Sequence, residues 1–187
     1  MVRFVGCIIY DGIGLTLMLP FQDNTQNMTL NEGIECYRNY LVQNNRKILI
    51  DESGSTLIRD HDATHVIFGL DISIDQETIL DTWVMWGCSF KWKYLLGYSK
   101  LPEIKELQRT LFKELGIKGF LKLYWNNIAV KRKAFVKAFK MKKKWPFKMP
   151  EEFLDMKISD LREMHGIKIL LKEELNYTPT KWTGSFD

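Results

Sequence analysis

The sequence predicts an all-α protein: a single-domain helical bundle with minor irregular or short extended segments. Apolar residues recur every three or four positions over several long stretches, and strand-like alternation is brief. The sequence of 187 residues contains no internal repeat and no stretch that resembles a linker. A chain of this length can bury one substantial core. We therefore expect residues 1–187 to form one domain, in which residues 1–29 are an apolar N-terminal segment.

The N-terminal segment from Val2 to Phe21 is mostly apolar. Asp11 lies in its middle, and the segment contains four glycines or prolines. We expect a core or membrane-surface segment rather than a membrane span. No small-residue cleavage site follows and no Arg-rich amphipathic pattern is present, so we expect neither a signal peptide nor a transit peptide.

The first half of the chain then predicts three helices. Ser73, with Gln76 three residues later, resembles a capping box at the start of the third helix. That third helix is apolar on more than one side, so we expect it to be central. The predicted ranges are Leu30 to Val42, Thr56 to Leu70 and Asp75 to Tyr94.

The second half predicts two longer helices and a short one. Gly116 ends the first of them and Gly166 closes the last. The final twenty residues are expected to form a short extended piece and a tail. The predicted ranges are Leu101 to Leu115, Gly119 to Phe139 and Ser159 to Met164.

Charge is distributed unevenly along the chain. The net charge is +4, yet Leu115 to Pro150 holds eleven Lys or Arg and no Asp or Glu, so the remainder carries 4 − 11 = −7. Such a run predicts either a surface for anionic partners, such as lipid headgroups, or a solvated helix face. No nucleic-acid motif accompanies it, and we expect no nucleic-acid partner. The candidate surface consists of Lys131, Arg132, Lys133, Lys142, Lys143 and Lys144.

Cysteine usage indicates the redox environment. Cys7, Cys36 and Cys88 are isolated and form no CxxC motif. An odd, scattered set favours a reducing compartment over a disulfide framework.

Two of the three histidines form the main candidate site. His61 and His65 lie one turn apart on one face of the predicted helix, and Asp62 lies about 100° from the first and about 60° from the second. Asp62 could bind a metal or orient a ring, and Glu77 would come from the start of the next helix. Two imidazoles and two carboxylates suit a divalent metal. The alternative is that both histidines make ordinary hydrogen bonds.

Two other known site types fit less well. An HD phosphohydrolase needs a further histidine upstream of the His61-Asp62 pair, and none precedes it. A zincin needs Glu directly after the first histidine, where this chain has Asp62.

The motif HD-x-x-H, followed by eleven residues and E, is similar to the signature of the Coq-four family of ubiquinone (coenzyme Q) biosynthesis proteins. The apolar run Val66 to Gly69 and the closing segment Ile158 to Ile167 also resemble that family. Residues 1–29 match it poorly, and the lysine-rich run Lys140 to Lys144 departs from it.

The resemblance implies an all-α homodimer, peripheral on the cytoplasmic face of the inner membrane, beside other quinone-biosynthesis proteins. It implies an oxidative decarboxylation, in which a hydroxyl replaces the C1 carboxyl of a polyprenyl hydroxybenzoate. His61, Asp62, His65 and Glu77 would be catalytic and would bind the metal, zinc first among zinc, iron, cobalt and manganese.

A polyprenyl substrate needs an apolar groove. Trp83, Trp86 and Phe90, with Met85 and Trp92, lie in the segment that could line one, although such aromatic residues at helical spacing could equally be core. The alternative function is a non-catalytic prenyl-lipid-binding or scaffold protein that organises quinone-biosynthesis enzymes at the membrane.

Overall fold

The computed structural model describes residues 9–10, 17–24, 27–90 and 101–182, and over these the protein is an all-α helical bundle, as the sequence predicts. Two short strand pairs accompany the helices: β1 (Ile9–Tyr10) runs antiparallel to β2 (Leu17–Met18), and β3 (Cys88–Ser89) runs parallel to β4 (Trp145–Pro146). The α-helices are α1 (Leu30–Gln43), α2 (Leu57–Phe68), α3 (Ile74–Gly87), α5 (Pro102–Phe139) and α6 (Ile158–His165). Single 3-10 turns are η1 (Pro20–Gln22), η2 (Glu151–Asp155) and η3 (Lys172–Glu174).

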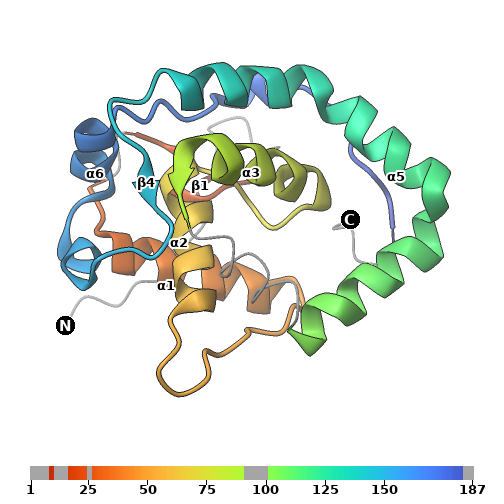
Figure 1. Cartoon of the computed structure of the whole chain (residues 1–187), viewed down its shortest axis with the longest axis horizontal. Coiled ribbons are helices and arrows are strands. Elements are labelled where there is room, and N and C mark those ends of the chain that lie inside the picture. Colours follow the sequence, from red (N-terminus) through yellow and green to blue (C-terminus); the bar gives the residue numbers. More distant parts are fainter. Residues whose placement is uncertain (1–8, 11–16, 25–26, 91–100, 183–187) are drawn as a thin grey trace.

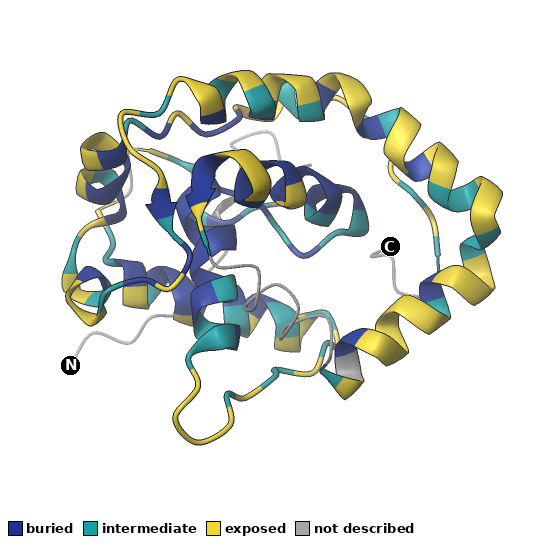
Figure 2. Cartoon of the chain, viewed as in Figure 1, coloured by how far each residue is buried: buried dark blue, intermediate teal, exposed yellow. Residues whose placement is uncertain are grey.

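The long α5 curves around the outside of α3, while α1 packs against α2 (Figure 1). Burial is concentrated in α2 and α3 and on the inward side of the surrounding helices (Figure 2). The third predicted helix is therefore central, as its apolar pattern indicates. The largest fully buried side chains include Phe21, Phe68, Trp83, Trp145 and Phe147.

Glycines end the helices where the sequence predicts. Gly116 has φ 59° and ψ −178° inside α5, so the two predicted helices Leu101–Leu115 and Gly119–Phe139 are continuous except for this break. Gly166 follows α6 with φ 68°, and an added Cβ there would lie 2.8 Å from the backbone nitrogen of Lys142. Only glycine fits that close approach in the left-handed region.

The predicted helix Asp75–Tyr94 was too long at its C-terminal end. α3 ends at Gly87, and Cys88 and Ser89 form β3 with Trp145 and Pro146. Pairing with a distant segment overrides the local helical pattern here. Residues 91–94 of the prediction lie outside the described residues.

The described end of the N-terminal segment belongs to the core. Leu19 and Phe21 are 2% and 1% exposed, which fits the expectation of a core segment for this part of Val2–Phe21. Most of the remaining segment lies outside the described residues. Within the described part of the chain, every helix is too short or too polar to cross a membrane.

Candidate metal centre and its cavity

The helix that carries both histidines is fixed at each end. Asp51 accepts hydrogen bonds from the backbone nitrogens of Ile58 (2.8 Å) and Arg59 (3.0 Å), which caps the N-terminus of α2. At the other end Gly69 adopts φ 69°, and the Leu70 nitrogen donates to the His65 oxygen at 2.9 Å. This Schellman ending turns the chain back toward α2.

The short turn that follows places Glu77. Ser73 caps α3 by accepting from the Gln76 nitrogen at 3.4 Å, as the predicted capping motif indicates. The Gln76 side chain, however, bonds to Asp71 rather than back to Ser73. Glu77 therefore lies in the first turn of α3, where the helix dipole favours a carboxylate.

His61, His65 and Glu77 come together between α2 and α3. Each offers a ligand atom, and these atoms lie within 4.8 Å of one another. The His65 Nε2 and the Glu77 Oε1 are 3.2 Å apart. The two imidazole rings meet edge to face, with centroids 5.0 Å apart. The structure thus brings together three of the four predicted ligands, from two helices.

Burial and charge set the protonation of these groups. Burial, together with the neighbouring His65, lowers the pKa of His61 to about 4. Burial is the largest single effect on His65 and would lower its pKa, but the charge and hydrogen bonding of Glu77, together with the charge of Asp62 and the Leu70 backbone, outweigh it, and the pKa of His65 is raised. Burial is also the largest single effect on Glu77 and would raise its pKa, but the charge and hydrogen bonding of His65, with the charge of His61, together lower the pKa of that carboxyl. At neutral pH His61 is therefore neutral and Glu77 is ionised.

The donor set fits a divalent metal. His65 is fully buried and its Nε2 lies 3.2 Å from Glu77 Oε1, but neither ring nitrogen makes a well-aligned hydrogen bond within the described part of the chain. Buried polar atoms in folded proteins nearly always have a partner, and an ion would supply one here. Two imidazole nitrogens and one carboxylate oxygen suit zinc with an open position, and also non-haem iron.

The structure does not bring Asp62 into this group. Its Oδ2 accepts a hydrogen bond from Arg38 Nε on α1, at 2.7 Å. Its offset of about 100° from His61 around the helix directs it toward α1 instead of α3. The ring of Tyr37, also on α1, stacks on His65 with a centroid distance of 4.6 Å. Asp62 and Tyr37 therefore support the histidine helix from the side away from Glu77.

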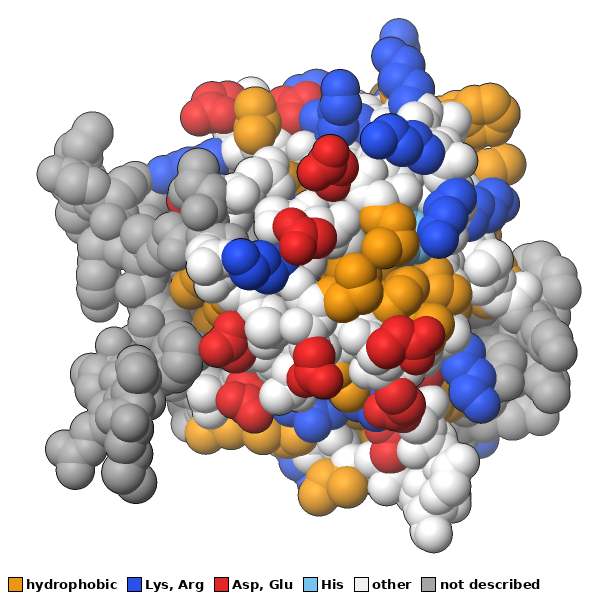
Figure 3. All heavy atoms as spheres, turned by 90° about the vertical axis from the view of Figure 1, so that its left-hand side faces the viewer, with side chains coloured by type: hydrophobic (Ala, Val, Ile, Leu, Met, Phe, Trp, Pro, Cys, Tyr) orange, Lys and Arg blue, Asp and Glu red, His pale blue; other side chains and the backbone are white. Residues whose placement is uncertain are grey.

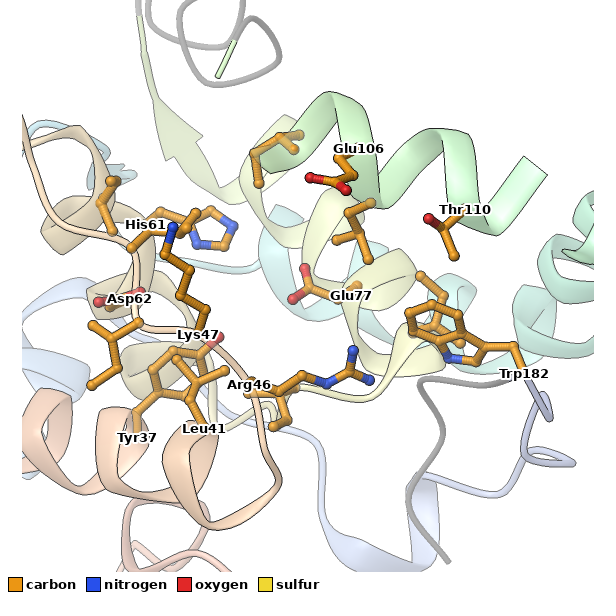
Figure 4. Close-up of a pocket in the computed structure, with 17 residues that line it drawn as sticks. Tyr37, Leu41, Arg46, Lys47, His61, Asp62, Glu77, Glu106, Thr110 and Trp182 are labelled. Atoms are coloured by element: carbon orange, nitrogen blue, oxygen red, sulfur yellow. The ribbon is translucent and has the colours of Figure 1, made fainter. Parts of the chain in front are cut away.

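A cavity of about 540 Å³ opens beside His61 and Glu77 (Figure 4). Its wall is mostly apolar and comes from α1, α2, α3, the N-terminal half of α5 and the C-terminal segment. Among its polar residues are Arg46, Lys47 and Glu106, which the sequence analysis did not single out. The apolar lining residues include Leu41, Ile48, Ile58, Ile72, Ile74, Ile104 and Leu107, with Trp182 at one edge.

The aromatic residues expected to line the lipid groove do not line this cavity. Trp83 is fully buried and stacks on Phe68, with ring centroids 4.7 Å apart, so it is a core residue. Trp86 is 44% exposed and meets Phe135 edge to face, and Phe90 packs against the core. Trp83 and Trp86 lie on α3, which packs against α5, whereas Phe90 follows β3. Trp92 lies outside the described residues.

The six candidate surface cations are distributed over α5 and the connection that follows it. Lys131 is half-buried and lies 4.3 Å from the ring centroid of Tyr124, whereas the other five are exposed. The side of the molecule that includes α6 and the end of this connection carries cations and carboxylates interspersed around a small hydrophobic group (Figure 3). On that side the basic run does not form a surface of one sign.

Comparisons with protein-family models, with curated proteins and with solved structures found no match for this chain. The geometry of the site and the motif in the sequence therefore carry the functional argument.

Proposed function

We propose that the protein is a divalent-metal enzyme of ubiquinone biosynthesis that replaces the ring carboxyl of a polyprenyl hydroxybenzoate with a hydroxyl. The observation that carries the proposal is the His61–His65–Glu77 group beside an apolar cavity. The similarity of the same residues, in type and spacing, to the Coq-four signature supports it. We assign zinc as the first candidate ion, with iron, cobalt and manganese as alternatives that accept the same donors.

The net chemistry can be written with dioxygen as the two-electron acceptor. The aryl carboxylate, water, dioxygen and a proton give the phenol, carbon dioxide and hydrogen peroxide. The ring–carboxyl bond breaks and a ring–oxygen bond forms. A bound divalent ion would act as a Lewis acid that stabilises negative charge on the substrate. The chain itself supplies the ligand carboxylate of Glu77, the two imidazoles and a mostly apolar wall beside the reacting group.

We further propose that the protein works on the anionic face of a membrane, as a homodimer beside other quinone-biosynthesis proteins. The outer side of α5 supports the lipid contact, because its exposed apolar side chains recur at helical spacing. Ile117, Leu121, Trp125 and Ile128 are 74%, 67%, 74% and 55% exposed. Exposed lysines and arginines flank them, each worth about 1 kcal/mol at an anionic surface. These are Lys118, Lys122, Arg132 and Lys133.

A second candidate is a non-catalytic carrier or scaffold for a prenylated lipid. The size of the cavity and its mostly apolar wall favour it, since a lipid chain would bury apolar surface there without any reaction.

Elemental analysis tests the metal centre. Protein purified under metal-replete conditions should carry about one divalent ion per chain, and His65→Ala and Glu77→Gln should each lose it. Glu106→Gln is the matched control, because Glu106 lines the same cavity but is not in the ligand group. Metal-free wild-type protein would overturn the proposal.

Complementation of a quinone-deficient strain separates the two candidates. His65→Ala should abolish growth if the protein is an enzyme. Growth with His65→Ala, together with loss of growth on charge reversal of Lys142, Lys143 and Lys144, would instead support the scaffold.

A further inference from the structure

Two cations reach the cavity from the segment between α1 and α2. Arg46 and Lys47 both line it, and Figure 4 shows them extending toward the side where His61 and Glu77 lie. Their backbone is fixed by the end of α1. Asn45 adopts φ 55°, and the Arg46 nitrogen donates to the Leu41 oxygen at 2.8 Å. This is the Schellman arrangement, so the direction of the segment is set by a helix ending rather than by a free loop.

Arg46 is oriented by a residue from the far end of the chain. The carbon of its guanidinium lies 5.0 Å from the ring centroid of Trp182. The backbone that carries Trp182 is held in place by Thr180, two residues before it. The Thr180 nitrogen and hydroxyl donate hydrogen bonds to the Asp75 carboxylate at 2.7 Å and 2.9 Å. Asp75 lies in the first turn of α3, as Glu77 does. The Trp182 platform and the Glu77 ligand are therefore fixed to the same helix end.

The residues that line the cavity indicate its ligand. Arg46 and Lys47 are two cations in a wall that is otherwise mostly apolar and includes Leu41, Ile72 and Ile104. Three carboxylates line the cavity: Asp62 is paired with Arg38, Glu77 approaches His65, and Glu106 is an exposed residue of α5. An amphiphile with an anionic head and an aliphatic remainder complements this arrangement, and a guanidinium recognises a planar carboxylate with two parallel hydrogen bonds.

We infer that Arg46 and Lys47 form a head-group subsite that binds the carboxylate of an amphiphilic ligand, and that Trp182 is the positioning residue for Arg46. The inference deepens the proposed function and rests on it only for the identity of the ligand. In this arrangement Arg46 and Lys47 hold the carboxylate of the ligand beside His61 and Glu77.

Dodecanoate, measured by calorimetry on chelator-treated protein, is the probe. Arg46→Gln and Lys47→Gln should each weaken its binding about tenfold, as expected for loss of a charge-assisted hydrogen bond. Arg46→Lys should weaken it less than Arg46→Gln. Arg109→Gln is the matched control, since Arg109 is an exposed arginine of α5 outside the cavity wall, and it should bind as the wild type does.

The role of Trp182 needs a separate readout. Trp182→Ala should weaken dodecanoate binding and Trp182→Phe should restore most of it, because the phenyl ring keeps a face for the guanidinium. The urea midpoints of both variants should match, which excludes a general loss of folding.

Three results would overturn the inference: no dodecanoate binding by the wild type, unchanged binding by both glutamine variants, or equal binding of dodecyltrimethylammonium. None of them depends on a metal, because the chelator removes it. Conversely, a chain that binds dodecanoate but carries no ion in metal-replete medium would overturn the proposed function and leave this subsite standing.

Discussion

Arg162 Nε donates a 2.9 Å hydrogen bond to the backbone oxygen of Ile67, so α6 holds the helix that carries the metal ligands. The same guanidinium donates to the oxygens of Val66 at 2.9 Å and Phe21 at 2.6 Å. Ile67 and Val66 lie in the last turn of α2, where carbonyls lack helical partners and a cation is favoured. Burial lowers the pKa of Arg162 to about 9, which still leaves it charged at neutral pH.

Replacing Arg162 should therefore destabilise the whole fold. Arg162→Met leaves several buried carbonyls without their donor, so we expect a loss of about 3 kcal/mol or more in the free energy of unfolding. Arg162→Lys should recover only part, since one ammonium cannot reach acceptors on three sides. Urea denaturation measures both. The exposed Arg132→Met should stay within about 0.5 kcal/mol of the wild type, and an equally small change for Arg162→Met would contradict this role.

Acid should weaken the fold through His165. Burial lowers the pKa of this histidine, which packs against Trp145 and Phe153 and bonds to the Leu161 oxygen at 2.9 Å. The unfolded chain binds the proton more readily, so the contribution of His165 is complete above about pH 6.5 and is lost as the pH falls below it. The urea midpoint of the wild type, minus that of His165→Phe at the same pH, should fall as the pH falls through this range. A difference that does not change with pH would contradict this role.

Metal binding should weaken with acid for a different reason. The raised pKa of His65 means that an incoming ion must displace a proton held beside Glu77, whereas His61 is already neutral. Zinc affinity should therefore increase with pH and level off above the pKa of His65, and binding below that pKa should release the proton that His65 holds. Calorimetry in two buffers of different ionisation enthalpy measures that proton. Affinity that stays constant between about pH 6 and pH 8 would refute the proton competition.

The break in α5 should depend on glycine alone. At Gly116 an added Cβ would meet nothing within 4 Å, so the cost of Gly116→Ala comes only from the backbone, which is in a region that other residues avoid. We expect a loss of about 1–3 kcal/mol in thermal or urea denaturation. Ala129→Ser, at an exposed position of the same helix, should change stability by less than about 0.5 kcal/mol. Equal stability for both variants would show that α5 straightens without penalty.

The sequence supports the fold class and the metal ligands because both depend on local periodicity. His61 and His65 share a helix face because they are four residues apart. Only five residues separate α2 from α3, so Glu77 in the first turn of α3 must lie close to the end of α2. The break at Gly116 and the helix end at Gly166 follow from the same local chemistry, whereas the end of α2 at Gly69 lies inside the predicted range Thr56 to Leu70.

Contacts between distant segments could not be predicted in this way. The pairing of Asp62 with Arg38 depends on which helix packs beside α2, and the burial of Trp83 depends on where Phe68 lies. Arg46 and Lys47 are two adjacent cations in the sequence, but nothing in the pattern around them places them beside His61. Nothing local relates Trp182 to Arg46, because the contact exists only after the chain has closed on itself.

The tie between Asp75 and Thr180 bears on the order in which the protein assembles. The metal ligands lie within a hairpin of α2 and α3, so their loops close early and at small entropic cost. The head-group platform requires a segment 105 positions further along the chain. The Trp182 platform therefore requires that residues far apart in the sequence come together, whereas the metal ligands need only the α2–α3 hairpin.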